Sequence, residues 1–445
     1  RHHFKNSAEA IYRNILQAVF TLVCLPYEAF ISLDAILRTG WRMLITKRKL
    51  LEWNPYGFDQ SSEYKNLFSV YVSMWIVPVV SLSVLTYLVL YSPFVLFIAL
   101  LFLLVWILSP AIVWWLSRPL DSGKTKLNHR QIYFLRKISR KTWGFFENFL
   151  GPEDNWLPPD NFQLHPITIL AHRTSPTNIG LCLLANLAAY DFGYITASQL
   201  IDRTLNSMRS MQRMERYAGH FYNWYDTVTL QPLLPKYISS VDSGNLAGHL
   251  LTLKQGLATL STEKFTYKKI MSGLFDVAII IDELLKPNEK ELFSSLKTVL
   301  EAAAEKGPDD PIEIYGHITS LYNQFLAIKD NIDCTSNKEL CWWLERMDQQ
   351  IEAAIEALKL LAPWADMTVI PESVSKTELF RQLRDLATVA GQLALDFDAI
   401  TPGYGHDIKT DEWLMQLQER MAAASAEAKK KLQTLYELVA LCETF

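Results

Sequence analysis

The stretch Arg216–Leu250, RYAGHFYNWYDTVTLQPLLPKYISSVDSGNLAGHL, concentrates aromatic, amide and acidic side chains in a segment that has neither a helical nor a strand period. Seven consecutive residues within it place flat apolar rings beside hydrogen-bonding groups, a combination that can stack on a sugar ring while fixing its hydroxyls. They are His220, Phe221, Tyr222, Asn223, Trp224, Tyr225 and Asp226. Taken alone, this run is equally compatible with an aromatic loop buried between two helices.

A second block, Ala171–Asn186, reads AHRTSPTNIGLCLLAN and shares a layout with Val241–Leu253: a capping residue, an asparagine three positions later and then an apolar run. The pattern predicts two helix starts, with Ser175 as N-cap before Pro176 in one and Asp242 as N-cap in the other. Because the first turn of a helix has unpaired N–H groups, two starts that converge would offer donors to a polyhydroxylated ligand.

In order and spacing, the segments HRTSPTNIG (172–180), GHFYNWYDT (219–227) and LPKYISSVDSGNLAGHL (234–250) closely resemble the glycoamylase-like middle module of cyclic β-1,2-glucan synthases, large membrane enzymes that build and close glucose rings. This resemblance covers roughly residues 156–256. The segments LPYEAFISLDAILRTGWR (25–42) and KLLEW (49–53) resemble the end of the glucosyltransferase module of the same enzymes. Since the first residue is Arg1 rather than Met, we expect the chain to be an internal part of a longer protein.

Composition narrows the class of protein. The 445 residues suffice for two or three domains, and a net charge of −4 without an extended basic tract argues against a nucleic-acid partner. The cysteines have neither CxxC nor Cys/His spacing, so we expect reduced thiols and no metal site. They are Cys24, Cys182, Cys334, Cys341 and Cys442.

Two uncharged stretches predict a transmembrane hairpin. Phe68–Leu90 and Pro93–Leu116 contain 23 and 24 residues without a charge, and each is long enough to cross a hydrocarbon core of about 30 Å as a helix. Only Tyr91 and Ser92 separate them, so the turn must be tight. The lipid bilayer is therefore an expected partner.

The residues before the hairpin are apolar in patches, but Pro26 and Glu28 interrupt the run Leu16–Leu33. We expect residues 1–53 to form an amphipathic helix in the membrane interface, with a soluble helical hairpin as the alternative. Basic residues flank the hairpin on both sides, which predicts a multi-pass protein, in a bacterial inner membrane by the resemblance, with its globular part in the cytoplasm. They are Arg38, Arg42, Lys47, Arg48 and Lys49 before it, and Arg118, Lys124, Lys126, Arg130, Arg136, Lys137, Arg140 and Lys141 after it.

The rest of the chain has helical periodicity, broken mainly by proline and glycine. Helices are predicted over Asn128–Leu150, Thr196–Glu215, Phe265–Leu285, Lys286–Lys306, Ile312–Ile332, Asn337–Leu361, Glu372–Phe397 and Asp411–Leu441. Short extended pieces are expected only near Tyr237–Ser240.

The predicted fold class is all-α: a transmembrane helical hairpin followed by an incomplete (α/α)6 toroid with additional long helices. A plain helical bundle is equally compatible with the pattern. The expected divisions are 1–127 for the membrane region and the end of the glucosyltransferase module, 128–260 for the start of the glycoamylase-like toroid, and 261–445 for a long-helix region.

Glycoside chemistry needs two carboxyl groups about 5–5.5 Å apart for retention or about 6.5–9.5 Å apart for inversion. The nearby candidates are Glu215, Asp226 and Asp242, but we do not assign them as the pair, since Asp242 suits an N-cap and Asp226 suits orienting an arginine or a sugar hydroxyl. The resemblance implies that the catalytic carboxylates lie beyond Phe445. It likewise places UDP-glucose and a divalent metal in an upstream transferase module, with no cofactor in this chain.

The sequence therefore predicts a substrate wall for β-1,2-glucan, with Trp224 or Tyr225 stacking on glucose and the charged and amide groups fixing hydroxyls. Its residues are Arg173, Thr174, Asn178, His220, Asn223, Trp224, Tyr225, Asp226, Asp242 and Asn245. Besides glucan and lipid, the expected partners are the upstream glucosyltransferase and downstream phosphorylase-like modules of one polypeptide. The alternatives are a membrane-anchored glycoside hydrolase or phosphorylase, a non-catalytic carbohydrate-binding helical scaffold, and a transporter or receptor.

Overall fold

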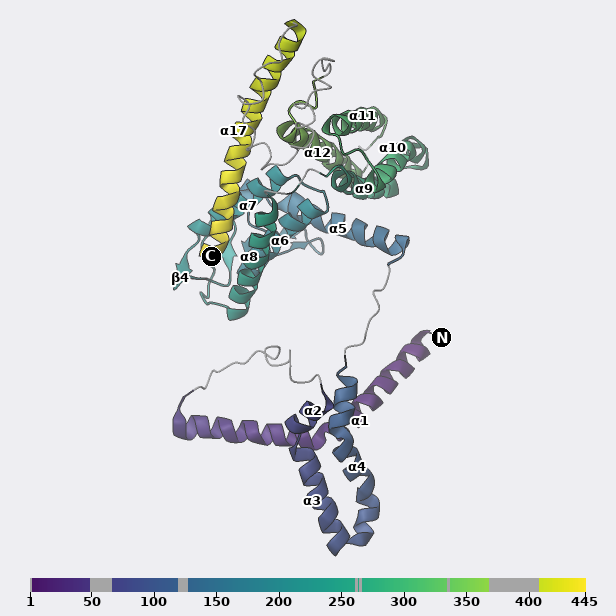
Figure 1. The fold of residues 1–445 in the computed structure, drawn as a ribbon, viewed down its shortest axis with the longest axis vertical. Helices are drawn as coiled ribbons and strands as arrows, with labels where there is room; N and C mark the ends of the chain where they lie inside the picture. The colour runs from purple at the N-terminus through teal and green to yellow at the C-terminus, as the bar shows by residue number, and fades with distance from the viewer. Residues whose placement is uncertain are drawn as a thin grey trace. The chain divides into compact units, whose positions relative to one another are not determined.

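A computed structural model of the chain describes residues 2–48, 66–118, 127–260, 263, 266–333, 337–367 and 408–445 (Figure 1). It forms two compact units, Arg1–Lys126 and Leu127–Phe445. Both units are built from helices, with only a few two-residue strands in the second, which confirms the all-α fold class. The toroid remains a prediction, and the helix predicted over Glu372–Phe397 lies outside the described residues.

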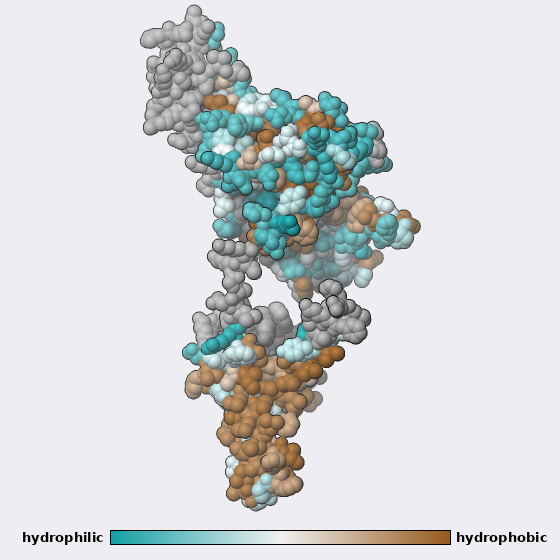
Figure 2. Space-filling view, turned by 90° about the vertical axis from the view of Figure 1, so that its right-hand side faces the viewer, coloured by the Kyte–Doolittle hydropathy of each residue, from teal (hydrophilic) through white to brown (hydrophobic). Residues whose placement is uncertain are grey.

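The first unit contains two helices long and apolar enough to cross a membrane, over Ala10–Thr46 and Pro93–Leu116. Apolar residues cover most of its visible surface (Figure 2). In the hairpin, Phe94 and Phe97 are 86% and 88% exposed, which is expected of side chains that face lipid rather than a protein core. The elements of this unit are α1 (His2–Trp41), the π-helix η1 (Arg42–Thr46), α2 (Leu67–Ser73), α3 (Ile76–Tyr91) and α4 (Pro93–Leu116).

The first arm of the hairpin is not the continuous helix that we predicted over Phe68–Leu90. It consists of α2 and α3, which meet at a bend of 71° and count as a third candidate span only when taken together. Pro78 explains the break: it lies in the first turn of α3, where a missing N–H is tolerated, whereas in a continuous helix its ring would clash with the carbonyl of Met74. The Tyr71 hydroxyl of α2 donates to the Ile107 carbonyl of α4 at 3.3 Å and ties the short helix to the hairpin.

The N-terminal segment forms a helix, as predicted, although a proline lies within it. Instead of being interrupted at Pro26, α1 continues through it as one helix that bends partway along its length (Figure 1). Proline has no N–H for the Leu22 carbonyl four residues earlier, and the Trp106 indole of α4 donates to this carbonyl at 2.9 Å. Satisfying a freed carbonyl is necessary for a helix in lipid, where water is absent. By length and composition this helix is also a candidate membrane span, and its position in the membrane interface stays a prediction.

The second unit contains the predicted helices with clear start signals. Asn128 and Gln131 form a capping box at the start of α5, and Thr196 and Gln199 form one at the start of α7. The helices are α5 (His129–Phe149), α6 (Pro176–Asp191), α7 (Ala197–Arg213), α8 (Ser240–Leu260), α9 (Tyr267–Leu284), α10 (Pro287–Glu305), α11 (Pro311–Lys329), α12 (Lys338–Leu361) and α17 (Ile408–Thr444).

Six short strands lie in the loops near the starts of α6 and α8, and none lies at residues 237–240, where we had expected extended pieces. Three antiparallel pairs form, β1 with β2, β3 with β6 and β4 with β5. The strands are β1 (Phe162–Gln163), β2 (Ile169–Leu170), β3 (Arg173–Thr174), β4 (Arg216–Tyr217), β5 (His220–Phe221) and β6 (Tyr225–Asp226).

Two apolar clusters form the core of the second unit. One lies within α9 to α12 and the first half of α17, and the other joins α6, α7 and α8 to the last turns of α17. As predicted, the apolar stripe of α7, including Leu200, Met208 and Met211, is buried in the second cluster. Helices α6 and α8 pack closely because Gly180 has no side chain: a Cβ there would lie 2.3 Å from His249 Nδ1.

Buried charges on α5 contact both clusters. Arg140 is fully buried, its guanidinium donates to both carboxylate oxygens of Glu147 at 2.7 and 3.2 Å, and it lies over the rings of Tyr194 and Trp343. One turn earlier, Arg136 Nε donates to Asp276 Oδ1 of α9 at 2.7 Å, and the Tyr194 hydroxyl donates to the other oxygen at 2.9 Å.

We had expected all cysteines to be reduced, and this expectation is wrong. Cys24, Cys182 and Cys442 are free and buried, but Cys341 in the first turn of α12 is disulfide-bonded. Cys334 lies outside the described residues. A disulfide requires two Cα atoms about 4.4–6.8 Å apart. The folded chain can meet this distance without a CxxC motif, which is why cysteine spacing did not predict the bond.

The Trp106–Leu22 contact can be tested by a double-mutant cycle. We expect Trp106→Phe to lower the free energy of unfolding in bilayers by about 0.6 kcal/mol, because the Leu22 carbonyl loses its donor. In a Pro26→Ala background the new backbone N–H reaches that carbonyl, so the same substitution should have a smaller effect. The measurement is unfolding of the four variants in lipid bicelles, and an equal loss in both backgrounds would contradict the assignment.

Candidate carbohydrate-binding site

Backbone pairing brings the two sequence blocks together. In the antiparallel pair of β3 and β6, Arg173 lies opposite Asp226 and Thr174 lies opposite Tyr225. The pairing is extended by the Thr227 N–H, which donates to the His172 carbonyl at 3.1 Å. The aromatic loop is therefore fixed to the chain immediately before α6.

The starts of α6 and α8 are both capped by serine. Ser175 Oγ accepts from the Asn178 N–H at 3.2 Å, as predicted. The prediction of Asp242 as the second N-cap is wrong, because α8 begins two residues earlier and Ser239 Oγ accepts from the Asp242 N–H at 3.2 Å. Serine and aspartate are both strong N-caps, and the serine three residues upstream occupies the position. The carboxylate of Asp242 is thus free for other contacts.

That carboxylate joins the two helix starts to the aromatic loop. Thr177 Oγ1 of α6 donates to Asp242 Oδ1 at 2.6 Å, and Asn245 Nδ2 of α8 donates to Thr177 Oγ1 at 3.1 Å. With its amide oriented to satisfy both ends, Asn223 donates to Asp242 Oδ2 at 2.9 Å and accepts from Trp224 Nε1 at 2.8 Å. A continuous chain of hydrogen bonds therefore runs from Asn245 to the Trp224 indole.

Arg173 completes the cluster through an acid that sequence reasoning missed. Its guanidinium carbon lies 4.8 Å from the centre of the Trp224 ring, and its terminal nitrogen is 2.9 Å from Asp160 Oδ2. Asn178 Nδ2 donates to the other oxygen of Asp160 at 3.2 Å. The one signal for Asp160 was its place after Pro158 and Pro159, a rigid pair that limits where the next side chain can lie.

Four predicted residues do not form the accessible wall. One is Asn223, which is buried and holds the Trp224 indole. Thr174 and Tyr225 are fully buried, so Tyr225 cannot stack on a sugar as we had proposed for it or Trp224. The Tyr225 hydroxyl donates to the Glu215 carbonyl at 2.6 Å, and burial raises its pKa to about 12. His220 is exposed on the β4–β5 hairpin, where it pairs with Tyr217.

Hydrogen bonds from the loop after β6 surround the carboxylate of Asp226. Burial raises the pKa of its carboxyl, but hydrogen bonds from the Thr229 backbone and hydroxyl, a third from the Val228 backbone and the nearby His172 outweigh this effect and lower the pKa overall. The three donors lie 2.7–3.0 Å from Oδ1. A carboxylate held ionised in this way orders the loop after β6 and is unsuited to donate a proton as a general acid.

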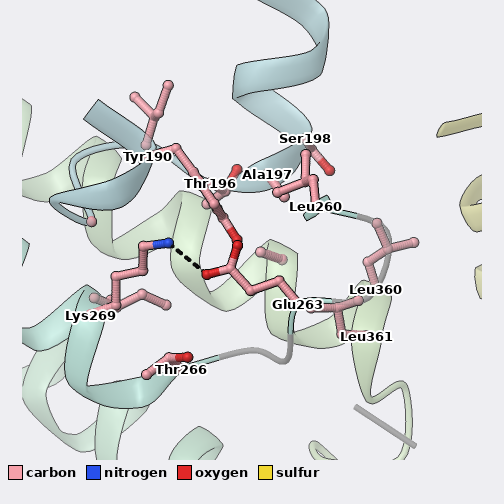
Figure 3. Close-up of a pocket in the computed structure, with 14 residues that line it drawn as sticks. Tyr190, Thr196, Ala197, Ser198, Leu260, Glu263, Thr266, Lys269, Leu360 and Leu361 are labelled. Carbon is pink, nitrogen blue, oxygen red and sulfur yellow. Dashed lines mark hydrogen bonds and ion pairs between the residues drawn. The ribbon is translucent and has the colours of Figure 1, made fainter. Parts of the chain in front are cut away.

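A separate cavity of about 70 Å³ lies where α6 and α8 end and α7 and α9 begin (Figure 3). Lys269 is fully engaged there: its Nζ lies 2.9 Å from Glu263 and 3.6 Å from the centre of the Tyr190 ring. The one aromatic face in this cavity is thus covered by a cation. Most of the remaining lining is aliphatic, so the cavity lacks the free polar groups that a sugar requires.

The described residues define a helical protein with candidate membrane-spanning helices and a polar, aromatic cluster where two helices begin. No family model matches the chain. A stretch of 289 residues, 64% of the chain, is 35% identical to the cyclic beta-(1,2)-glucan synthase NdvB of Rhizobium meliloti (strain 1021), and this stretch amounts to 10% of that protein. The chain is therefore related to this synthase, and it spans about a tenth of the relative's length.

The structural assignment of Asp226 predicts a pH dependence. Because its folded pKa is below the usual aspartate value, its contribution to stability is present above about pH 4 and is lost as the pH falls through the folded pKa. We expect Asp226→Asn to lower the midpoint of denaturant unfolding at pH 7, with a difference from wild type that shrinks below pH 4. A difference that is constant between pH 7 and pH 3 would show that the charge is irrelevant.

Proposed function

We propose that the chain is part of a cyclic β-1,2-glucan synthase and that residues 127–260 supply a wall which holds the glucan. The proposal is supported by the relationship to the rhizobial synthase and by the hydrogen-bonded cluster that joins Arg173, Trp224, Asp242 and Asn245. In the complete enzyme, polymerisation would use UDP-glucose and a divalent metal in an upstream module. Cyclisation would proceed by transglycosylation on carboxylates outside this chain.

The cluster suits a neutral, polyhydroxylated ligand. Trp224 is partly exposed, and its indole is held by Asn223 on its edge and by Arg173 against its ring, so its orientation is set before a ligand arrives. Arg173 has half of its side-chain surface exposed although it is bound to Asp160, which leaves donors for hydroxyl groups. Asn245 is also exposed and is hydrogen-bonded to Thr177 in the same cluster. An ordered aromatic face with neighbouring donors lowers the entropy lost on sugar binding.

Glucan binding tests this proposal. We expect the full chain in lipid nanodiscs to bind β-1,2-linked glucose oligosaccharides in preference to β-1,3-linked ones of equal length. Trp224→Ala should weaken binding about tenfold or more, since a stacked aromatic face is lost. His220→Ala serves as the matched control, because this exposed ring lies on the β4–β5 hairpin, whereas Trp224 lies after that hairpin and contacts Arg173. Calorimetric titrations that show no linkage preference, or equal effects of the two substitutions, would refute the wall.

The orientation of the second unit is part of the proposal and has opposing indications. The basic flanks of the hairpin favour the cytoplasm, whereas a disulfide at Cys341 is typical of an oxidising compartment. The basic flanks set the proposed orientation, because charge asymmetry acts at membrane insertion. A green fluorescent protein fused after Phe445 should therefore fluoresce in bacterial cells, while an alkaline phosphatase fusion at the same position should be inactive. The reverse result would place this unit outside the cytoplasm.

A further inference from the structure

A second polar groove, of about 580 Å³, lies between the last turns of α7 and the loop Gly151–Asp160. It is distinct from the wall, and no predicted site residue lines it. Its lining combines an indole, two guanidinium groups and three amides. These groups belong to Asn155, Trp156, Asn206, Arg209, Gln212 and Arg213.

The backbone beside the groove is strained. Asn155 and Trp156 are consecutive non-glycine residues in the left-handed region, with φ of 51° and 57°. This conformation is unfavourable for a residue as large as tryptophan and persists only where the surroundings enforce it. Here Ser207 Oγ donates to the Trp156 carbonyl at 2.7 Å, and Asn155 Nδ2 donates to the carbonyls of Thr227 and Val228 at 2.9 and 2.8 Å. These hydrogen bonds maintain the strained backbone, and this conformation places the Trp156 indole in the lining of the groove.

Several donors of the groove are unused. Within the described ranges, the side chains of Asn206, Arg209 and Gln212 have no hydrogen-bond partner, and neither Arg209 nor Arg213 is paired with a carboxylate. Arg213 donates only to Asn155 Oδ1 at 2.9 Å and to Ser210 Oγ at 3.1 Å. Free amide and guanidinium donors beside an aromatic ring have the composition of a saccharide subsite.

The same loop supports both the groove and the wall. Asp160 binds Arg173 at the wall, while Asp154 accepts from Thr227 and lies 2.8 Å from His172 Nδ1, one residue before Arg173. A connection of five residues joins α6 to α7, and the two helices pack against each other, so they run antiparallel. The last turns of α7 therefore lie beside the start of α6. The groove therefore opens at the same end of the helices as the wall.

We propose that this groove is an outer subsite for the same β-1,2-glucan chain, occupied by glucose units that extend beyond the wall. The inference rests on the proposed function of the wall. It predicts that long oligosaccharides gain affinity from Trp156, Arg209 and Gln212, whereas a disaccharide that fills only the wall does not.

Length-dependent binding tests the outer subsite in the full chain in nanodiscs. We expect wild type to bind a long linear β-1,2-glucan more tightly than the β-1,2-linked disaccharide. Arg209→Ala with Gln212→Ala should weaken binding of the long chain about tenfold and leave the disaccharide unchanged. Trp156→Ala should act in the same direction. The control is Lys429→Ala with Gln433→Ala, an exposed cation and amide on α17 whose removal should change neither affinity.

The outcomes separate the two proposals. If Trp224→Ala weakens the disaccharide but the Arg209/Gln212 variant retains the full gain for the long chain, the outer subsite is refuted and the wall stands. If Trp224→Ala leaves the disaccharide affinity unchanged, the wall itself is refuted. A further titration uses UDP as an anionic probe: loss of UDP binding instead of glucan binding in the Arg209/Gln212 variant would assign the groove to an anion and overturn the inference.

Discussion

The second unit depends on the ion pairs that α5 buries between its two apolar clusters. Arg140 is enclosed by Glu147, which lies on α5 itself, and by two rings. The ring of Tyr194 comes from the turn before α7, and the ring of Trp343 comes from α12. Arg136, also on α5, pairs with the fully buried Asp276 of α9. An unpaired charge at such depth costs about 3–5 kcal/mol, so α5 cannot shift by a turn without losing this partner. The backbones on either side also meet closely, since a Cβ on Gly273 of α9 would lie 2.2 Å from the Gly193 carbonyl. Helices α6 to α8 are thereby held in register with α9 to α12.

The membrane unit follows a related constraint with backbone groups in place of charges. Two of its prolines, Pro26 and Pro78, interrupt helical hydrogen bonding, and the structure accommodates these two interruptions differently. At Pro26 the helix continues and the indole of Trp106 satisfies the freed carbonyl. At Pro78 the chain divides into two helices and the proline becomes part of a first turn. Both arrangements pair backbone groups that a helix crossing a membrane could not leave unsatisfied.

In the candidate wall, polar side chains such as Arg173 and Asn245 are ordered by hydrogen bonds and still remain exposed. Three aspartates, Asp160, Asp226 and Asp242, each hold a neighbouring segment through hydrogen bonds, which accounts for their presence without a role in bond cleavage. This arrangement is consistent with the proposal that the chemical centre lies in another part of a synthase. The loop Gly151–Asp160 contributes to the wall and the outer groove alike, so the two surfaces would respond together to changes in that loop.

The sequence by itself determined the elements whose signals are local. Charge-free length identified the hairpin, a capping residue followed by an apolar run identified the start of α6, and helical periodicity identified α5 and α7, because these preferences arise within a few turns of chain. Only the tertiary structure decided which side chains share a site. Tyr225 and Trp224 are adjacent and chemically similar, yet one is buried against Glu215 and the other is partly exposed beside Arg173. The hydrogen bonds that Thr177 donates to Asp242 and Arg173 donates to Asp160 likewise join residues whose positions in the chain imply no contact. Such contacts depend on how the chain packs and not on local preference.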